Sequence, residues 1–459
     1  MAATLLRTIR LMQTAVDRLE LPVELKDVER LGIMVNKAMS TQARNFHTAE
    51  HVFNLARQDQ PLQILAALFH DIVYYSIDQG FIPEIEEILI NYVYIDEGDI
   101  VIREDLDPGH SCIQAVLAVF GFQPGDHLPA FGGMNECLSA MVLVHELEPF
   151  MKRIDLLQVI CSIEATIPFR KPDENGNTPP QRLASRVADL NKARKMGLKE
   201  PDITSMVQHA VIFANTDVEN FAEREVAAFL DNTWKLLPET NPSLRTTGLY
   251  TVKNYRIALQ KMEGFMNFLN PSLIFTSYKG VPGEEDLKDL NYRAKRNVLA
   301  ARDYLGVKLL TTGVLEAIAD ISGGDVPIAL LMGDISDAQS IDHFESMLPH
   351  AEVQKGAAIG STVYSLLAEG RNSNTNFDLN RSPLAKHIYL HIGSAALKDY
   401  LATLKEMFDG IRSPEDFLDT LPSNLILPVI RACAEMAFTR RAILNAFADS
   451  REAAKGAAG

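Results

Sequence analysis

The sequence predicts an almost entirely α-helical protein. Apolar residues recur every three or four positions through most of the 459 residues, which is the periodicity of amphipathic helices. Alternating apolar runs bounded by turn residues, which are typical of strands, are scarce. Apolar residues make up 47% of the chain and charged residues 23%, close to the average for folded globular proteins, so wholesale disorder is excluded.

The N-terminal part of the chain divides into short predicted helices. Residues 4–20 place their apolar side chains on one face. The stretches 47–59 and 61–75 predict a helical hairpin, whose second helix starts at Pro61, a residue tolerated in a first helical turn. The same periodicity predicts further helices over 84–93, 111–120, 136–148, 152–166 and 182–194.

Turn-forming residues interrupt this pattern. The polar stretches 94–110 and 169–181 are rich in Gly, Pro, Asn and charge, and we expect both to be exposed loops. Beyond residue 200 the helical pattern continues over 202–213, 217–234, 247–268, 284–305 and 309–450, with polar breaks at 333–337 and 369–383. Because 459 residues exceed one typical domain, we expect one domain over 1–200 and a further helical region over 201–459.

Charge and cysteine usage narrow the class of protein. The 44 Lys and Arg residues against 60 Asp and Glu residues give a net charge of −16, which disfavours tight binding of polymeric nucleic acid. The absence of an apolar run of about 18 residues predicts no membrane span. We expect a soluble cytoplasmic protein with reduced thiols, and homo-oligomerisation is left open; the cysteines are widely spaced, at Cys112, Cys137, Cys161 and Cys433.

Three histidines and an aspartate form the most informative cluster. His47 and His51 are four residues apart, so on a helix they project from one face one turn apart. His70 and Asp71 lie in the apolar run QILAALFHDIVYY, where a buried carboxylate is costly unless a cation compensates it. A lone His-Asp pair is more often only hydrogen-bonded, but the preceding pair of histidines favours a metal site. Imidazole and carboxylate ligands together suit zinc, iron or manganese.

Three segments resemble one family. ARNFHTAEHV (43–52), LAALFHDIVY (65–74) and RVADLNKA (186–193) resemble the HD-domain superfamily of metal-dependent phosphohydrolases, and most of all the branch with the cyclic nucleotide phosphodiesterases and small bacterial HD hydrolases. The resemblance implies an HD-domain helical core over about residues 30–195, with the region 201–459 of unassigned role. It implies that the metal ligands are His51, His70, Asp71 and Asp189.

The resemblance also implies roles around the metal. His47 matches the residue that gives a proton to the leaving oxygen, and Thr166 in SIEATIPFR matches a residue close to the metal waters. The cofactor is one or two divalent ions of Zn, Mg, Mn or Fe. Phosphodiesterases carry a further histidine shortly after the His-Asp pair, where this chain has Tyr74 and Tyr75, so the second metal and a cyclic nucleotide substrate stay open.

These residues predict phosphate ester hydrolysis. A metal held by them would lower the pKa of a bound water and present hydroxide to phosphorus, with Asp71 at the reacting centre. We expect a small phosphorylated substrate, most simply a nucleotide. Arg44, Arg182 and Arg186 are candidates for holding its phosphate oxygens, with a solvated surface as the alternative.

Two other functions remain open from the sequence. An HD-type di-iron oxygenase would need extra ligands, for which His110 and His145 are candidates. A helical ligand-binding or regulatory protein with a vestigial metal site is the second alternative. Asp217 in NTDVENF is expected only to cap the start of the helix predicted over 217–234.

Overall fold

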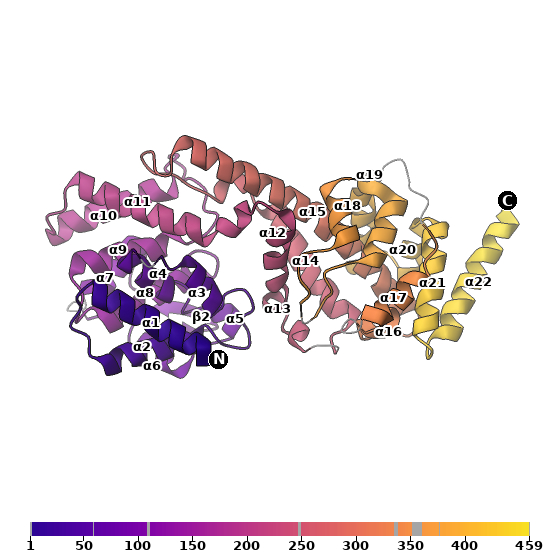
Figure 1. Ribbon diagram of the computed structural model, residues 1–459, viewed down its shortest axis with the longest axis horizontal. Coiled ribbons are helices and arrows are strands. Elements are labelled where there is room, and N and C mark those ends of the chain that lie inside the picture. Colours follow the sequence, from indigo (N-terminus) through magenta and orange to yellow (C-terminus); the bar gives the residue numbers. More distant parts are fainter. Residues whose placement is uncertain are drawn as a thin grey trace. The chain divides into compact units, whose positions relative to one another are not determined.

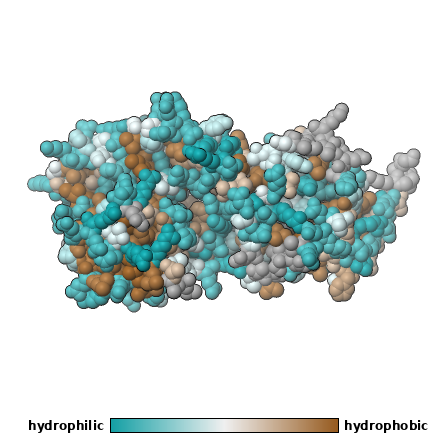
Figure 2. All heavy atoms as spheres, in the orientation of Figure 1, coloured by the Kyte–Doolittle hydropathy of each residue, from teal (hydrophilic) through white to brown (hydrophobic). Residues whose placement is uncertain are grey.

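Helices make up most of the structure, so the predicted all-α class is confirmed (Figure 1). The computed structural model describes residues 2–57, 59–107, 111–246, 249–334, 338–350, 360–375 and 377–458. Within this part of the chain, no helix has the length and apolar character needed to cross a membrane. Figure 2 shows hydrophilic side chains over most of the face drawn, with hydrophobic patches among them.

The chain forms two compact units. The first comprises Met1–Ala222 together with Asn270–Ala294, and the second comprises Glu223–Leu269 together with Lys295–Gly459. The boundary expected at residue 200 therefore lies inside the first unit. It does so because the helix that follows residue 200 packs along the helix Arg153–Ala165 of the same unit.

The first unit is built from short helices and one hairpin. Its elements are α1 (Ala2–Arg18), α2 (Leu25–Ala38), α3 (Ala49–Leu55), α4 (Pro61–Phe69), α5 (Tyr75–Asp78), α6 (Pro83–Leu89), β1 (Val93–Asp96), β2 (Asp99–Ile102), α7 (Ser111–Phe120), α8 (Met134–Leu147), α9 (Arg153–Ala165), α10 (Pro179–Arg194), α11 (Glu200–Asp217) and the 3₁₀ helices η1 (Glu219–Ala222) and η3 (Pro271–Leu273).

Helix α4 lies in the core of this unit. The residues from Ile64 to Phe69 are completely buried, and α4 packs against α1, α3, α8 and α9. A helix that is apolar all round is stable only when other elements cover every face. The next residue, His70, therefore emerges from the centre of the fold rather than from its surface.

The stretch expected as a loop over 94–110 contains a β-hairpin. Strands β1 and β2 pair antiparallel, with Asp96 opposite Asp99. The two residues between them, Glu97 and Gly98, have φ of 48° and 97°. Positive φ at both central residues is what a tight two-residue hairpin turn requires, and Gly supplies one of them without strain.

A segment from the second half of the chain returns to the first unit. The Asn215 side chain donates a hydrogen bond to the Thr276 carbonyl at 2.8 Å and accepts one from the Thr276 amide at 3.1 Å. Lys279 adds an ion pair with Glu200 at 3.0 Å. The segment is thus fixed to both ends of α11 by polar contacts between residues more than sixty positions apart.

The second unit is helical in all its regular elements that the structure describes. They are α12 (Val226–Lys235), α13 (Leu237–Thr240), η2 (Pro242–Arg245), α14 (Val252–Phe268), most of α15 (Glu284–Ile321), α16 (Ile328–Met332), α17 (Ala338–Ser346), α18 (Thr362–Glu369), α19 (Pro383–Phe408), α20 (Pro414–Thr420), α21 (Ser423–Met436) and α22 (Arg441–Ala458).

The polar break predicted over 369–383 is anchored in the core of the second unit. Asp378 accepts hydrogen bonds from Trp234 Nε1 and the Tyr255 hydroxyl, both at 2.8 Å, and from Arg371 at 3.2 Å. The Arg371 guanidinium also stacks on the Trp234 ring, 4.3 Å from its centroid. These contacts compensate the buried charges, so Arg371 has a structural role here.

Candidate metal centre

Three of the four predicted metal ligands meet at one point in the first unit. His51 comes from α3, His70 follows the last residue of α4, and Asp71 is next in the chain. One ligand atom from each of these three side chains lies within 4.8 Å of the others. The histidines come from two helices that pack against each other, as the predicted hairpin required.

Asp217 completes the cluster, and its role was missed from the sequence. Its Oδ1 lies 2.9 Å from His51 Nε2 and 3.4 Å from His70 Nε2. Asp217 is the last residue of α11 and not the start of a helix as expected. The end of α11 therefore brings a second carboxylate oxygen to the two imidazoles.

Asp189, the fourth predicted ligand, is not among the residues that the structure brings together at this centre. It lies exposed on α10, which faces the core with Leu183, Val187 and Leu190. A carboxylate two residues from Val187 on a helix points about 160° away from the buried side. The sequence RVADLNKA resembles the expected motif, but its aspartate faces solvent.

The hydrogen bonding of His70 tests whether the cluster suits a cation. Its Nδ1 lies 3.0 Å from the Ala67 carbonyl, which can only accept, so Nδ1 carries the proton. The other nitrogen, Nε2, is buried and makes no hydrogen bond among the described residues. It faces carboxylate oxygens of Asp71 at 3.0 Å and Asp217 at 3.4 Å. A lone pair facing two anions requires a proton or a metal ion between them, so the donor set fits a divalent cation.

The charges in the cluster shift one another's pKa values. Burial opposes the charged form of His70, yet the Asp71 and Asp217 carboxylates raise its pKa well above 6.5. Burial also works against ionised Asp71, but His70, His47 and His51 hold the pKa of that carboxyl well below its usual range. For Asp217 burial raises the pKa, but the hydrogen bond from His51 and the nearby His70 imidazole outweigh burial and lower it to about 2. Without a metal, the cluster attracts a proton to His70.

We expect the metal-free protein to lose stability as pH rises above neutrality. The pKa of folded His70 exceeds its unfolded value of 6.5, so its stabilisation is complete below that pH and is lost as pH rises through the folded pKa. A cation takes the place of the proton, so the gain in Tm on adding metal should grow with pH.

The measurement is Tm against pH from about 6 to about 9, with and without chelator. The variant His70→Gln, which has no imidazole to titrate, should flatten the metal-free curve. A metal-free Tm that climbs steadily over this interval would contradict the assignment of His70.

His47 lies beside the cluster, although it does not share a helix with His51. It belongs to the bend before α3, which begins only at Ala49. Its ring centroid lies 6.1 Å from that of His51 and 4.6 Å from that of Tyr74, edge to face in both cases. The charge of His47 also lowers the pKa of Asp71, so His47 acts electrostatically on this centre.

A further acidic side chain near the cluster was not predicted. Glu136 stands in the first turn of α8. Burial raises its pKa to about 7, and the negative charges of Asp71 and Asp217 add to the rise. A carboxyl group that titrates near neutral pH beside a metal centre is suited to accept a proton. Burial in the fold and the nearby carboxylates together produce this shift, so the sequence held no signal for it.

Arg44 was predicted to hold substrate phosphate, but in the structure its guanidinium is engaged by groups of the protein itself. The side chain is completely buried and pairs with Asp78 at 2.6 Å. It also donates a hydrogen bond of 2.6 Å to the backbone carbonyl of Asp71. Its contacts are with the protein's own polar groups.

The two arginines proposed from α10 also have structural partners. Arg186 pairs with the fully buried Glu164 and donates to the Phe120 carbonyl at 3.1 Å. Arg182 donates to the Lys171 carbonyl at 3.3 Å, which holds the loop expected over 169–181. Neither contact presents a guanidinium to the metal centre, and their substrate-binding roles are not supported by these positions.

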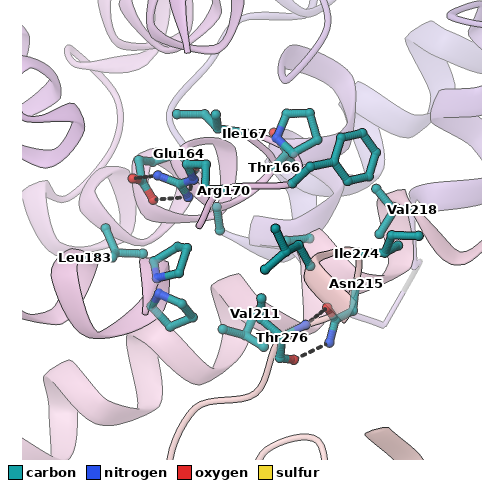
Figure 3. A pocket seen from close by; sticks show the side chains of 17 residues that line it. Glu164, Thr166, Ile167, Arg170, Leu183, Val211, Asn215, Val218, Ile274 and Thr276 are labelled. Carbon is teal, nitrogen blue, oxygen red and sulfur yellow. Dashed lines mark hydrogen bonds and ion pairs between the residues drawn. The ribbon is translucent and has the colours of Figure 1, made fainter. Parts of the chain in front are cut away.

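Thr166 lies in the wall of a small pocket next to α11. Its hydroxyl donates to the Ile163 carbonyl at 2.7 Å. Figure 3 shows the Glu164–Arg170 ion pair on one side of the pocket and the Asn215–Thr276 hydrogen bonds on another. Because Asn215 and Val218 flank Asp217 in the chain, the pocket adjoins the turn that carries the fourth ligand atom. Thr166 thus supports the surroundings of the centre rather than its ligand set.

Of the two extra histidines considered for a second metal, His145 is not part of the cluster. His145 accepts or donates a hydrogen bond of 2.7 Å with the Tyr92 hydroxyl and is exposed at the surface. His110 lies outside the described residues. Among the residues that the structure describes, His51, His70 and Asp71 are the group whose ligand atoms lie close enough together to hold a metal ion.

Comparison with protein-family models, with curated proteins and with solved structures gives no match. The interpretation of this centre therefore depends on its residues and their geometry.

Proposed function

We propose that this protein is a metal-dependent phosphohydrolase acting on a phosphate ester. The observation that carries the proposal is the buried Nε2 of His70, which lacks a hydrogen bond and faces the carboxylates of Asp71 and Asp217. His51 adds a second imidazole, 2.9 Å from Asp217. Two imidazoles and two carboxylates are a donor set that binds zinc, iron or manganese.

Each residue of the centre has a distinct task in this proposal. His51, His70, Asp71 and Asp217 would hold the cation, which when bound supplies positive charge for phosphoryl oxygens and a water of lowered pKa. His47 protonates the leaving oxygen, since it lies next to the cluster but outside its ligand set. Glu136 accepts the proton that the attacking water loses, because its pKa of about 7 matches neutral conditions.

A nucleotide is the substrate class that we favour within this reaction. Its support is the resemblance of the segments around His51 and His70 to HD-domain hydrolases and phosphodiesterases. The net charge of −16 supports a small substrate over a long nucleic acid, because polymer binding depends on many phosphate contacts with cationic residues.

The decisive experiment combines metal analysis with ester hydrolysis. The purified protein is loaded with Zn²⁺, Mn²⁺, Mg²⁺ or Fe²⁺, its metal content is measured, and p-nitrophenyl phosphate and bis-p-nitrophenyl phosphate are assayed. We expect bound metal and hydrolysis, both lost in the double variant His70→Ala/Asp71→Ala. Metal that remains bound in the double variant, or a wild-type protein that binds none, would refute the proposal. Iron with oxygen consumption and no ester hydrolysis would instead support the oxygenase alternative.

We also expect Glu136 to shape the pH dependence of hydrolysis. As a proton acceptor Glu136 must be ionised, so kcat/KM should rise with pH up to about 7, or to a lower pH because the cation favours the ionised form. The isosteric variant Glu136→Gln should remove this acidic limb and lower kcat by about 10²–10⁴.

The neighbouring variant Glu148→Gln, at the other end of α8, serves as control and should keep the wild-type profile. If kcat/KM still rises with pH in the same way in Glu136→Gln, a group other than Glu136 accepts the proton.

A further inference from the structure

We propose that Arg44 is a positioning residue that fixes the metal ligand Asp71 relative to the proton donor His47. This inference rests on the function proposed above. It assigns Arg44 a role that acts through its backbone contact with Asp71, and not through substrate.

The contacts of Arg44 join two separate stretches of chain. Its Nη1 donates to the Asp71 carbonyl at 2.6 Å, and its Nη2 reaches the Ile72 carbonyl at 3.5 Å. Nη2 and Nε also bind the Asp78 carboxylate, at 2.6 Å and 3.1 Å. Arg44 itself stands three residues before His47, in the connection between α2 and α3. The guanidinium thus links the segment that carries His47 to the turn that carries Asp71.

The turn after α4 depends on side chains for its hydrogen bonds. In this turn the Val73 amide donates to the Ser139 hydroxyl and the Tyr75 amide to the Asn135 side chain, both at 3.1 Å. Arg44 donates hydrogen bonds to backbone carbonyls of the same turn, those of Asp71 and Ile72. Buried backbone groups without partners are costly, so these side chains set the path of the turn and with it the direction of the Asp71 carboxylate.

The geometry calls for arginine in particular. The planar guanidinium spreads its N–H groups over two carbonyls and one carboxylate at once, whereas a lysine ammonium is a compact charge on a single atom. Asp78 makes burial of the cation tolerable, and Thr41 in turn donates to Asp78 at 2.7 Å. Arg44, Asp78 and Thr41 therefore form a closed polar unit behind the metal centre.

The test is binding of Co²⁺ to the full-length protein, measured by calorimetry and by the visible absorption spectrum of the bound ion. Arg44→Lys keeps the charge but cannot span the three acceptors. We expect it to weaken Co²⁺ binding by about 10–100-fold, the range for loss of a group that orients a metal ligand, and to alter the Co²⁺ spectrum. The kcat for an alkyl phosphate should fall more than KM changes, because His47 and the metal lose their alignment.

Two controls separate positioning from folding. Arg256→Lys disrupts a similar bidentate pair with Glu316 in the second unit, with contacts of 2.7 Å and 2.9 Å, and should leave Co²⁺ binding unchanged. Asp78→Asn keeps Arg44 in place but weakens its anchor, and should shift the affinity and the spectrum in the same direction as Arg44→Lys. If Arg44→Lys does not fold, Asp78→Asn serves as the test variant in its place.

The outcomes distinguish this inference from the proposed function. A folded Arg44→Lys, or Asp78→Asn in its place, that binds Co²⁺ with the wild-type affinity and spectrum would overturn the positioning role alone. A wild-type protein that binds no Co²⁺ would overturn the proposed function and this inference with it.

Discussion

The variant Asp217→Asn is expected to lose metal and hydrolysis, while Asp189→Asn keeps both. The amide of asparagine keeps the shape of the side chain but removes the negative charge that balances the cation. We expect metal affinity to fall by more than the 10–100-fold that loss of an outer partner costs, because Asp217 Oδ1 contacts both imidazoles directly. The measurement is metal content after dialysis, together with kcat for p-nitrophenyl phosphate.

The comparison of these two variants shows whether the ligand is Asp189, as the sequence motif predicts, or Asp217, as the geometry indicates. Both replace an aspartate on a helix of the first unit, but Asp189 is exposed on α10 and Asp217 ends α11 beside His51. Equal loss of metal in both variants would point to a general loss of structure. Loss of metal in Asp189→Asn alone would support Asp189 as a ligand, as predicted from RVADLNKA.

The variant His47→Gln should retain metal and lose turnover selectively for poor leaving groups. A general acid is needed when the departing oxygen is a strong base, and contributes about 10²–10⁴ in rate. We therefore expect a fall of that size in kcat for an alkyl phosphate. For p-nitrophenyl phosphate, whose leaving group departs as a stable anion, we expect only a small change.

The slope of log kcat against the pKa of the leaving group is the measurement for His47. It should be steeper in His47→Gln than in the wild-type protein. The variant Tyr74→Phe keeps the aromatic ring that contacts His47 and serves as control, with the wild-type slope expected. An equal fall for all esters, with loss of metal, would make His47 a ligand rather than a proton donor.

Local patterns in the sequence were sufficient for the helical class and for three of the four residues of the candidate centre. The apolar periodicity around residues 61–75 predicted a buried helix, and its apolar character on every side is why α4 lies in the core. His51, His70 and Asp71 could be named because His51 lies on one helix of a hairpin and the other two residues directly follow the second helix. Neighbouring helices joined by a short connection pack together, so residues near their facing ends meet.

The structure changed the expected surroundings of two predicted residues, His47 and Arg44. His47 precedes α3, so it approaches the cluster from a bend and not from one helical face shared with His51. Arg44 was predicted to hold substrate phosphate because a guanidinium suits phosphate oxygens, and only the fold shows that Asp78 compensates its buried charge. The HD-domain assignment itself remains a prediction.

The sequence by itself determined that the chain is helical, that it carries no membrane-spanning helix among the described residues, and which two histidines and which adjacent aspartate gather. The tertiary structure alone decided the second carboxylate of the cluster, Asp217, and the burial and nearby charges that raise the pKa of Glu136 to about 7. The reason is physical: local periodicity fixes which face of a helix is buried, but the meeting of distant helix ends depends on how whole helices pack. Asp189 and Asp217 are both helical aspartates in sequence, and only packing places one in solvent and the other between two imidazoles.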